Sequence, residues 1–155
     1  MLKNKIQNII SELLNKAGFE NPEITFDETD DSIIFFSVKT ERLNSLIGNN
    51  GEILVAINYL VTKILEKEKL EQELPHFIVD VNNFRRKKIE EIRTNAHMLA
   101  ERVKYFKSEI EVDPMSAYDR KIMHSYLQNI KNIKTESIGL GRDRHIVIKF
   151  TEESV

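Results

Sequence analysis

A four-residue segment, Gly48-Asn49-Asn50-Gly51, separates two stretches that both space their apolar residues as helices do. Glycine adopts backbone conformations that are closed to other residues, and it lets a second chain approach closely. A helix that begins after Gly51 presents unpaired N–H groups and the positive end of its dipole at this point. The segment therefore predicts a tight turn between two helices, and a place where a phosphate group binds.

The first 81 residues predict the order helix, strand, strand, helix, helix, strand. The opening helix carries apolar residues three and four positions apart and ends before Gly18. A turn at Asp30-Asp31 joins the first two strands, and the third strand covers residues 76–81. The helix after the glycine turn has an apolar stripe of Ile53, Ile57, Leu60 and Ile64, widened by Leu54, Val61 and Leu65. This order predicts a three-stranded sheet with three helices on it.

Asn82-Asn83 is the candidate linker to a second domain, whose predicted order is helix, strand, helix, strand, strand. The apolar stripe of its long first helix is Ile89, Ile92, Ala96, Leu99, Val103 and Phe106. Ser116 with Asp119 three residues later is a capping-box pattern, which predicts a helix start. We therefore predict an α+β protein of two small domains, residues 1–81 and 82–151.

The net charge of −2 conceals an uneven distribution along the chain. Residues 1–81 contain 8 Lys/Arg and 14 Asp/Glu, whereas residues 82–150 contain 15 and 9. The second domain is therefore the better candidate for contact with a polyanion, and ordinary surface variation is the alternative. There is no cysteine, which excludes disulfides and thiolate metal sites and suits a reducing cytoplasm. The N-terminus lacks an unbroken apolar core, so neither a signal peptide nor membrane insertion is expected.

Arg120 and His124 are four residues apart, which places them one above the other on the same face of the predicted helix. Arginine offers a flat fork of donors to a phosphate group, and a histidine beside it adds a donor or a stacking surface. Spacing alone is weak support, because Arg93 and His97 repeat it on the long helix. His97 adjoins the predicted core stripe there, so we expect it to be structural or merely exposed.

Residues 1–81, above all LIGNNGEILVAINYL at 46–60, resemble a KH domain of the bacterial type II topology, αββααβ. In that family the Gly-x-x-G loop clamps about four nucleotides of single-stranded backbone. The resemblance implies RNA contacts at Ile47, Gly48, Asn49, Asn50 and Gly51, with Ile53 or Leu54 lining the groove. The family commonly has Lys or Arg in the middle of this loop, whereas Asn-Asn brings no charge, so backbone binding by this half is expected to be weak. A packing turn in a degenerate KH fold is the alternative.

The segments DPMSAYDRKIMHSYLQ at 113–128 and TESIGLGRDRHIVI at 135–148 resemble the R-3-H domain, named for its Arg-x-x-x-His motif, here with the order αβαββ. That family binds single-stranded nucleic acid. The resemblance places the motif pair on Arg120 and His124, and the later family elements on Ser137, Gly139 and Arg144. Arg142 lies in the same turn and is expected to add charge. A solvated hairpin tip is the alternative.

A KH domain joined directly to an R-3-H domain, over residues 1–150, is similar to the Jag family. The resemblance implies a bacterial post-transcriptional regulator that affects cell shape and division. It also implies partnership with a small single-KH protein, and a homodimer is a further expectation. Many Jag proteins carry an extra N-terminal domain with a basic linker, whereas this sequence begins in the KH helix, which puts the contribution of that domain in doubt.

These patterns predict a protein that binds single-stranded RNA, or single-stranded DNA, and is not an enzyme. No cofactor or metal is expected, because the four histidines lack metal-ligand spacing and GNNGEI lacks the Lys-Ser/Thr of a P-loop. Arg120, Arg142 and Arg144 are predicted to supply most of the charge, with help from Arg85, Arg86, Lys87 and Lys88. Two alternatives stay open: an adaptor whose KH fold serves as a dimer or partner surface, and a nuclease with His124 as general base.

Overall fold

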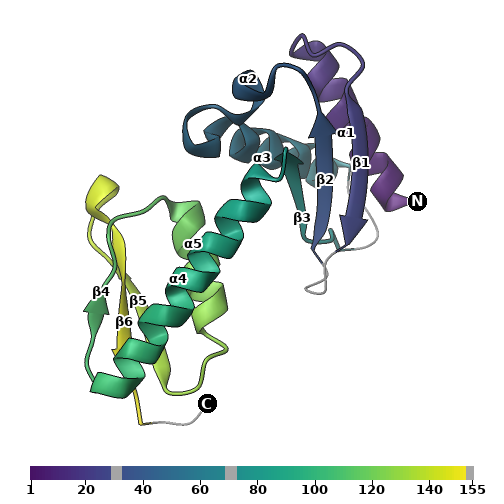
Figure 1. Cartoon of the computed structure of the whole chain (residues 1–155). Coiled ribbons are helices and arrows are strands. Elements are labelled where there is room, and N and C mark those ends of the chain that lie inside the picture. The colour runs from purple at the N-terminus through teal and green to yellow at the C-terminus, as the bar shows by residue number, and fades with distance from the viewer. Residues whose placement is uncertain (29–32, 69–72, 153–155) are drawn as a thin grey trace. The chain divides into compact units, whose positions relative to one another are not determined.

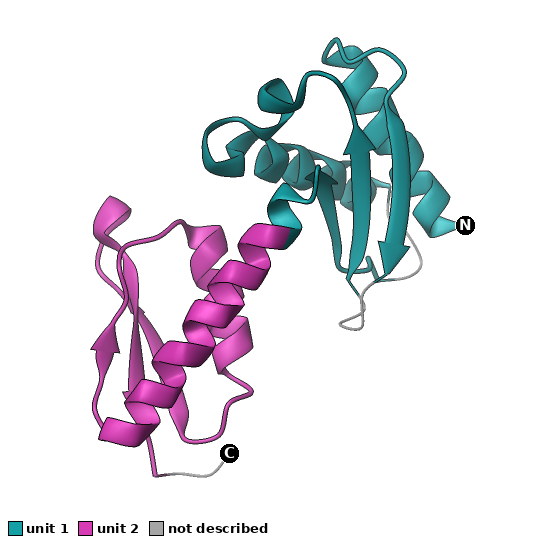
Figure 2. Cartoon of the chain, in the orientation of Figure 1, with its two compact units in different colours: residues 1–86 teal, residues 87–155 magenta. Residues whose placement is uncertain are grey.

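The chain forms two compact units, residues 1–86 and 87–155 (Figure 2). The computed structural model describes residues 1–28, 33–68 and 73–152, and each unit has a small sheet with helices packed on it (Figure 1). The predicted α+β class is confirmed. The predicted turn at Asp30-Asp31 lies outside the described residues.

Unit 1 has the element order predicted from its sequence. Its elements are α1 (Leu2–Lys16), β1 (Glu23–Glu28), β2 (Ile34–Lys39), α2 (Leu43–Ile47), the 3-10 turn η1 (Asn49–Gly51), α3 (Glu52–Lys67) and β3 (Phe77–Val81). The sheet order is β1-β2-β3, with β1 antiparallel to β2 and β2 parallel to β3. A parallel pair needs a crossover connection, and α2, η1 and α3 supply it.

The core of unit 1 lies between its sheet and the two long helices α1 and α3. Helix α3 turns Leu54, Ile57, Val61 and Leu65 into this core. The predicted main stripe is therefore wrong at Ile53, Leu60 and Ile64, which are more than one-third exposed. Helix α3 is apolar on more than one side, so spacing alone could not tell which side faces the sheet.

Unit 2 also has the predicted order of elements. They are α4 (Phe84–Phe106), β4 (Ile110–Glu111), α5 (Ala117–Leu127), β5 (Ile133–Ile138), the 3-10 turn η2 (Gly141–Asp143) and β6 (His145–Phe150). The first three residues of α4 belong to unit 1, and the helix belongs to unit 2 from residue 87 onward. The sheet order is β4-β6-β5, and both pairs are antiparallel. Helices α4 and α5 pack on one face of this sheet through Ala96, Ala100, Val103, Met123 and Leu127. The expected core residue Phe106 is instead 66% exposed, because the packed part of α4 ends near Val103.

The predicted linker Asn82-Asn83 is a tight turn that leads directly into α4. Both asparagines have positive φ angles, 52° and 57°, a conformation that asparagine tolerates better than most residues. Asp80, only 1% exposed, accepts hydrogen bonds from the backbone N–H groups of Val81 at 2.7 Å, Arg85 at 2.8 Å and Arg86 at 3.1 Å. Its carboxylate therefore caps the start of α4, as an N-cap side chain does.

Candidate nucleic-acid interface

Helix α5 carries the Arg120/His124 pair of unit 2. The Ser116 side chain accepts a hydrogen bond from the Asp119 N–H at 3.1 Å, so the predicted helix start is confirmed. Met123 and Leu127 turn into the core, whereas His124 is exposed and Arg120 is partly exposed. The pair therefore stands on the outer side of α5, where a ligand can reach it.

The Arg120 guanidinium is held by the segment that precedes its own helix. Its Nη1 donates to the Met115 carbonyl at 2.7 Å. Met115 N–H in turn donates to the Arg144 carbonyl at 3.4 Å, which connects this segment to the residue just before β6. A guanidinium has five N–H donors, so one anchoring bond leaves the others for a ligand.

His124 and Arg144 are both anchored on strand β5. His124 Nδ1 forms a 2.5 Å hydrogen bond with Thr135 Oγ1, and Arg144 Nε donates to Ser137 Oγ at 3.0 Å. Thr135 and Ser137 are two residues apart, so they lie on the same face of β5, roughly 7 Å from each other. Sequence reasoning missed Thr135, although its alternation with Ser137 along the predicted strand was a usable signal. The strand thus holds one nitrogen of each side chain and leaves His124 Nε2 and the Arg144 Nη groups for other contacts.

The turn between β5 and β6 is closed tightly against its own backbone. Gly139 has a φ of +92°, and a Cβ there would lie 2.9 Å from the Asp143 carbonyl oxygen and 3.1 Å from Arg144 Cα. His145 Nδ1 also bonds to the Asp143 carbonyl, at 2.8 Å. Arg142 is exposed within this turn. The fixed turn therefore presents Arg142 and Arg144 from a defined position.

The glycine turn of unit 1 faces both solvent and its own chain. Asn49 and Asn50 are exposed, while Ile47 and Gly48 are half-buried. Gly51 is buried, with a φ of +82°, and a Cβ there would lie 2.6 Å from the Phe84 ring. The side chains that this turn offers to a ligand are therefore those of Asn49 and Asn50, and Gly51 serves the packing of the turn. Leu54 is also in the core, which leaves Ile53 as the partly exposed residue beside the turn.

Comparison with known proteins identifies a matching domain family and several relatives. Residues 90–150 match the R-3-H domain family. The protein named RNA-binding protein KhpB from Clostridium symbiosum is 31% identical over 118 residues, which is 76% of this chain and 52% of that protein. Its namesake from Bacillus subtilis is 32% identical over 128 residues, 81% of this chain and 60% of that protein.

This chain contains an R-3-H domain and is similar to the Jag family over most of its length. A further relative, RNA-binding protein KhpB from Streptococcus pneumoniae, is 26% identical over 115 residues, 74% of this chain and 34% of that protein. The chain therefore spans between a third and three fifths of the length of these relatives. The matched R-3-H range contains Arg120, His124, Thr135, Ser137 and Arg144, whereas the glycine turn lies outside it.

Several basic residues of this chain are already engaged by acidic or aromatic partners. Arg86 pairs with Asp27 at 2.9 Å and lies 4.2 Å over the Phe35 ring. Arg85 is only 2% exposed, so the expectation that it contacts RNA is wrong; it lies four residues before the buried Ile89 on the inward face of α4. Lys88 Nζ lies 3.3 Å from the Asp119 carboxylate. Of the four cations expected at 85–88, Lys87 has the exposed position.

Lys149 is a further cation of unit 2, but it lies away from the Arg120 site. Residue 149 alternates with the core-facing Ile148 along β6, so it is on the sheet face opposite Thr135 and Ser137. A hydrogen bond to Glu136, with the charge of that carboxylate, raises the pKa of Lys149. Its charge is therefore already matched on that face.

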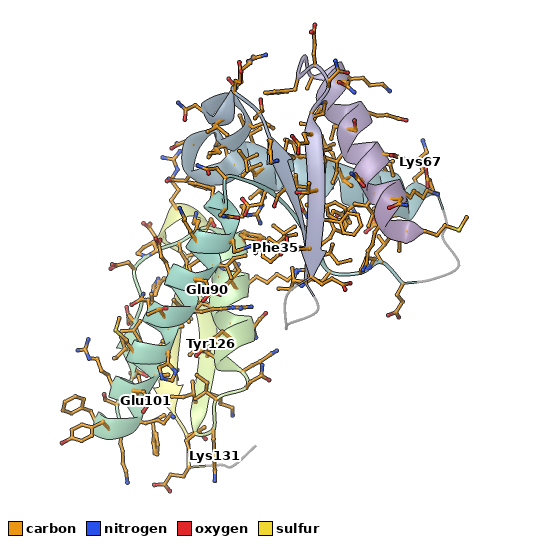
Figure 3. The ribbon with its side chains drawn as sticks, turned by 45° about the vertical axis from the view of Figure 1, so that its right-hand side comes forward. Phe35, Lys67, Glu90, Glu101, Tyr126 and Lys131 are labelled. Carbon is orange, nitrogen blue, oxygen red and sulfur yellow. The ribbon has the colours of Figure 1, made fainter. Side chains whose placement is uncertain are left out.

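The second Arg/His pair of the chain, Arg93 and His97, lies on α4 as the sequence predicted. Figure 3 shows Tyr126 alongside α4, between the levels of Glu90 and Glu101, and its hydroxyl lies 3.2 Å from His97 Nδ1. Arg93 pairs with Glu90 at 3.7 Å. His97 contacts helix α5 and is exposed, much as His124 contacts Thr135 of β5 and is exposed. The two pairs differ at the arginine, because Arg93 pairs with a carboxylate whereas Arg120 donates to a backbone carbonyl.

Among the described residues, no group of three or more His, Asp or Glu side chains lies together as the ligands of a metal ion would. Within residues 1–28, 33–68 and 73–152, no helix combines the length and the apolar character that crossing a bilayer requires.

Proposed function

We propose that this chain binds single-stranded RNA, without catalysing a reaction, through Arg120, His124 and Arg144 of unit 2. The supporting observation is that each side chain is fixed by one hydrogen bond and keeps further nitrogens for a ligand. A guanidinium fork matches phosphate oxygens, and an anchored side chain loses little freedom on binding. The relatives named RNA-binding protein KhpB add independent support.

Unit 1 contributes a weaker, KH-type contact in this proposal. Its αββααβ order and its exposed Asn49 and Asn50 support such a role. Asparagine amides donate hydrogen bonds to phosphate but bring no positive charge. Residues 1–86 also contain 14 acidic and 10 basic residues, so the field around the turn opposes an anion.

We also propose the wider cellular role that the resemblance to the Jag family implies. The chain would act in the bacterial cytoplasm as a post-transcriptional regulator linked to cell shape and division. A small single-KH protein, or a second copy of the chain, would be its protein partner. Single-stranded DNA is the second nucleic acid that the same donors would accept, because they contact phosphates rather than the 2′-hydroxyl.

Arg120→Ala is expected to weaken RNA binding about tenfold for all sequences, because a charged hydrogen-bond donor to phosphate is lost. The slope of log affinity against log salt should become shallower by about 0.7, the value for one phosphate on a single strand. Fluorescence anisotropy with a labelled single-stranded RNA, titrated at several salt concentrations, measures both quantities.

Arg93→Ala is the matched control, since it removes the same charge from the same Arg-x-x-x-His spacing on α4. It should leave affinity and slope close to those of the wild type. If a folded Arg120→Ala protein shows the wild-type affinity and slope, the site is misassigned. Cleavage of the labelled RNA by the wild type, lost in His124→Ala, would instead establish a nuclease.

A protein-interaction adaptor is the second candidate, and one observation favours it. The outer side of α3 exposes Ile53, Tyr59, Leu60 and Ile64, the kind of apolar surface that protein interfaces cover. An adaptor would bind RNA weakly and hold a protein partner tightly.

Leu60→Asp separates the two candidates, because a charge in an apolar interface opposes association. For the adaptor we expect sedimentation analysis to show a wild-type complex that the variant loses. For the RNA-binding protein we expect the variant to keep its RNA affinity. A loss of RNA affinity in a folded, monomeric Leu60→Asp protein would contradict the proposed site on unit 2.

A further inference from the structure

We infer that Leu140, at the tip of the β5–β6 hairpin, contacts a nucleobase of the strand whose phosphates Arg120 and Arg144 bind. The inference rests on the proposed function and adds to it a base-contacting residue in unit 2. The phosphate donors of that unit recognise any nucleic-acid backbone, whereas a base contact requires an apolar or aromatic surface beside them.

Leu140 is 86% exposed, against 40% for Ile138 two residues earlier in the same hairpin. A single exposed apolar side chain needs no special explanation by itself. This one is distinguished by its neighbours, because Gly139 and Gly141 flank it and Arg142 follows. Its surroundings are therefore too small and too polar for an apolar protein interface, and they suit a ligand that combines charge with a flat ring.

The backbone around Leu140 is held in place before any ligand arrives. Asp143 N–H donates to the Leu140 carbonyl at 3.2 Å, and Arg144 N–H donates to the Gly141 carbonyl at 3.4 Å. Gly141 has a φ of +55°, and Gly139 is pressed against the far side of the turn. The turn thus keeps the Leu140 side chain in solvent, so that a ligand meets a pre-organised contact.

A continuous set of hydrogen bonds places this tip beside the phosphate donors. Arg144 N–H donates to the carbonyl of Gly141, next to Leu140, and the Arg144 carbonyl accepts from Met115 N–H. The Met115 carbonyl in turn accepts from Arg120 Nη1. Arg144 Nε is fixed on Ser137 at the other side of the hairpin. A nucleotide carries its base one sugar away from its phosphate, so a phosphate bound by Arg144 brings a base to the tip.

Two ligands of similar charge separate a base contact from a charge contact: an oligouridylate and inorganic polyphosphate, which has phosphates but no bases. Leu140→Ala is expected to weaken oligouridylate binding about fivefold, because the apolar area that it covers is lost. Polyphosphate binding should not change. Arg120→Ala should weaken the binding of both ligands.

Met98→Ala is the control, since it removes a 56% exposed apolar side chain from α4 of the same unit and should affect neither ligand. Leu140→Tyr should restore or strengthen oligouridylate binding, because a ring stacks on a base. The inference fails if Leu140→Ala binds oligouridylate as the wild type does, or loses both ligands equally. A wild type that binds no RNA at low salt would refute the proposed function itself, together with this inference.

Discussion

Replacing Asp80 with alanine is expected to lower the free energy of unfolding of unit 1 by about 3 kcal/mol. The buried carboxylate accepts three backbone hydrogen bonds, and two of its donors are at the start of α4. Alanine leaves these N–H groups without their acceptor in a site closed to water. Denaturation in urea, followed by circular dichroism, measures the change.

Two further variants show whether the capping geometry is responsible. Asp80→Asn keeps one oxygen for the N–H groups of Val81 and Arg85 but turns an amide toward the Arg86 N–H. We therefore expect it to lower the free energy of unfolding by less than Asp80→Ala does. Asp27→Ala removes an exposed acid that pairs with Arg86, and exposed pairs contribute less than about 1 kcal/mol. Equal losses for Asp80→Ala and Asp27→Ala would show that the cap is unimportant.

Gly51→Ala is expected to cost about 3 kcal/mol, the sum of a left-handed backbone and an overpacked contact. The added methyl would lie 2.6 Å from the Phe84 ring at a φ of +82°. Gly18→Ala is the matched control, because its φ is +90° and no atom lies within 4 Å of the new Cβ. We expect Gly18→Ala to lower the free energy of unfolding by about 1 kcal/mol, the cost of the left-handed backbone alone.

A double-mutant cycle with Phe84→Leu isolates the steric part of the Gly51 effect. The smaller side chain should recover a portion of the loss caused by Gly51→Ala, measured by the same denaturation experiment. Equal costs at Gly51 and Gly18 would show that the Phe84 contact does not matter. It also follows that Gly51→Asp is a poor test of RNA binding, because lost affinity would then reflect a damaged fold.

The order of elements in both units could be predicted because local patterns determine it. Period-two and helical spacing mark the strands and helices, and glycine or asparagine turns separate them. The start of α5 at Ser116 was predictable for the same reason, since a cap involves residues only three apart.

Which side of an element is buried depends on distant contacts, and there the sequence was less informative. Helix α3 is apolar on more than one side, so its inward side was assigned wrongly at Ile53 and Leu60. Arg85 belongs to a basic run that suggests a solvated surface, yet it lies on the same face of α4 as the buried Ile89 and is itself buried.

The candidate site also has a part that could be predicted from the sequence and a part that could not. Arg120 and His124 could be placed on one helix face from their spacing alone. Their anchors could not, because the Thr135 and Met115 contacts depend on how strand, loop and helix pack together. The burial of Gly51 was hidden as well, since the residue that covers it is 33 positions further along the chain.

Helix α4 begins within unit 1 and continues into unit 2, and this affects how the protein can be divided for experiments. A fragment that stops at Val81 would lose the Phe84 ring over Gly51. It would also lose two of the three N–H groups that donate hydrogen bonds to Asp80. Such a truncation would leave the Asp80 carboxylate with one of its three backbone donors and Gly51 without the ring that covers it. An excised N-terminal piece should therefore extend at least through Arg86 if its glycine turn is to keep its native conformation.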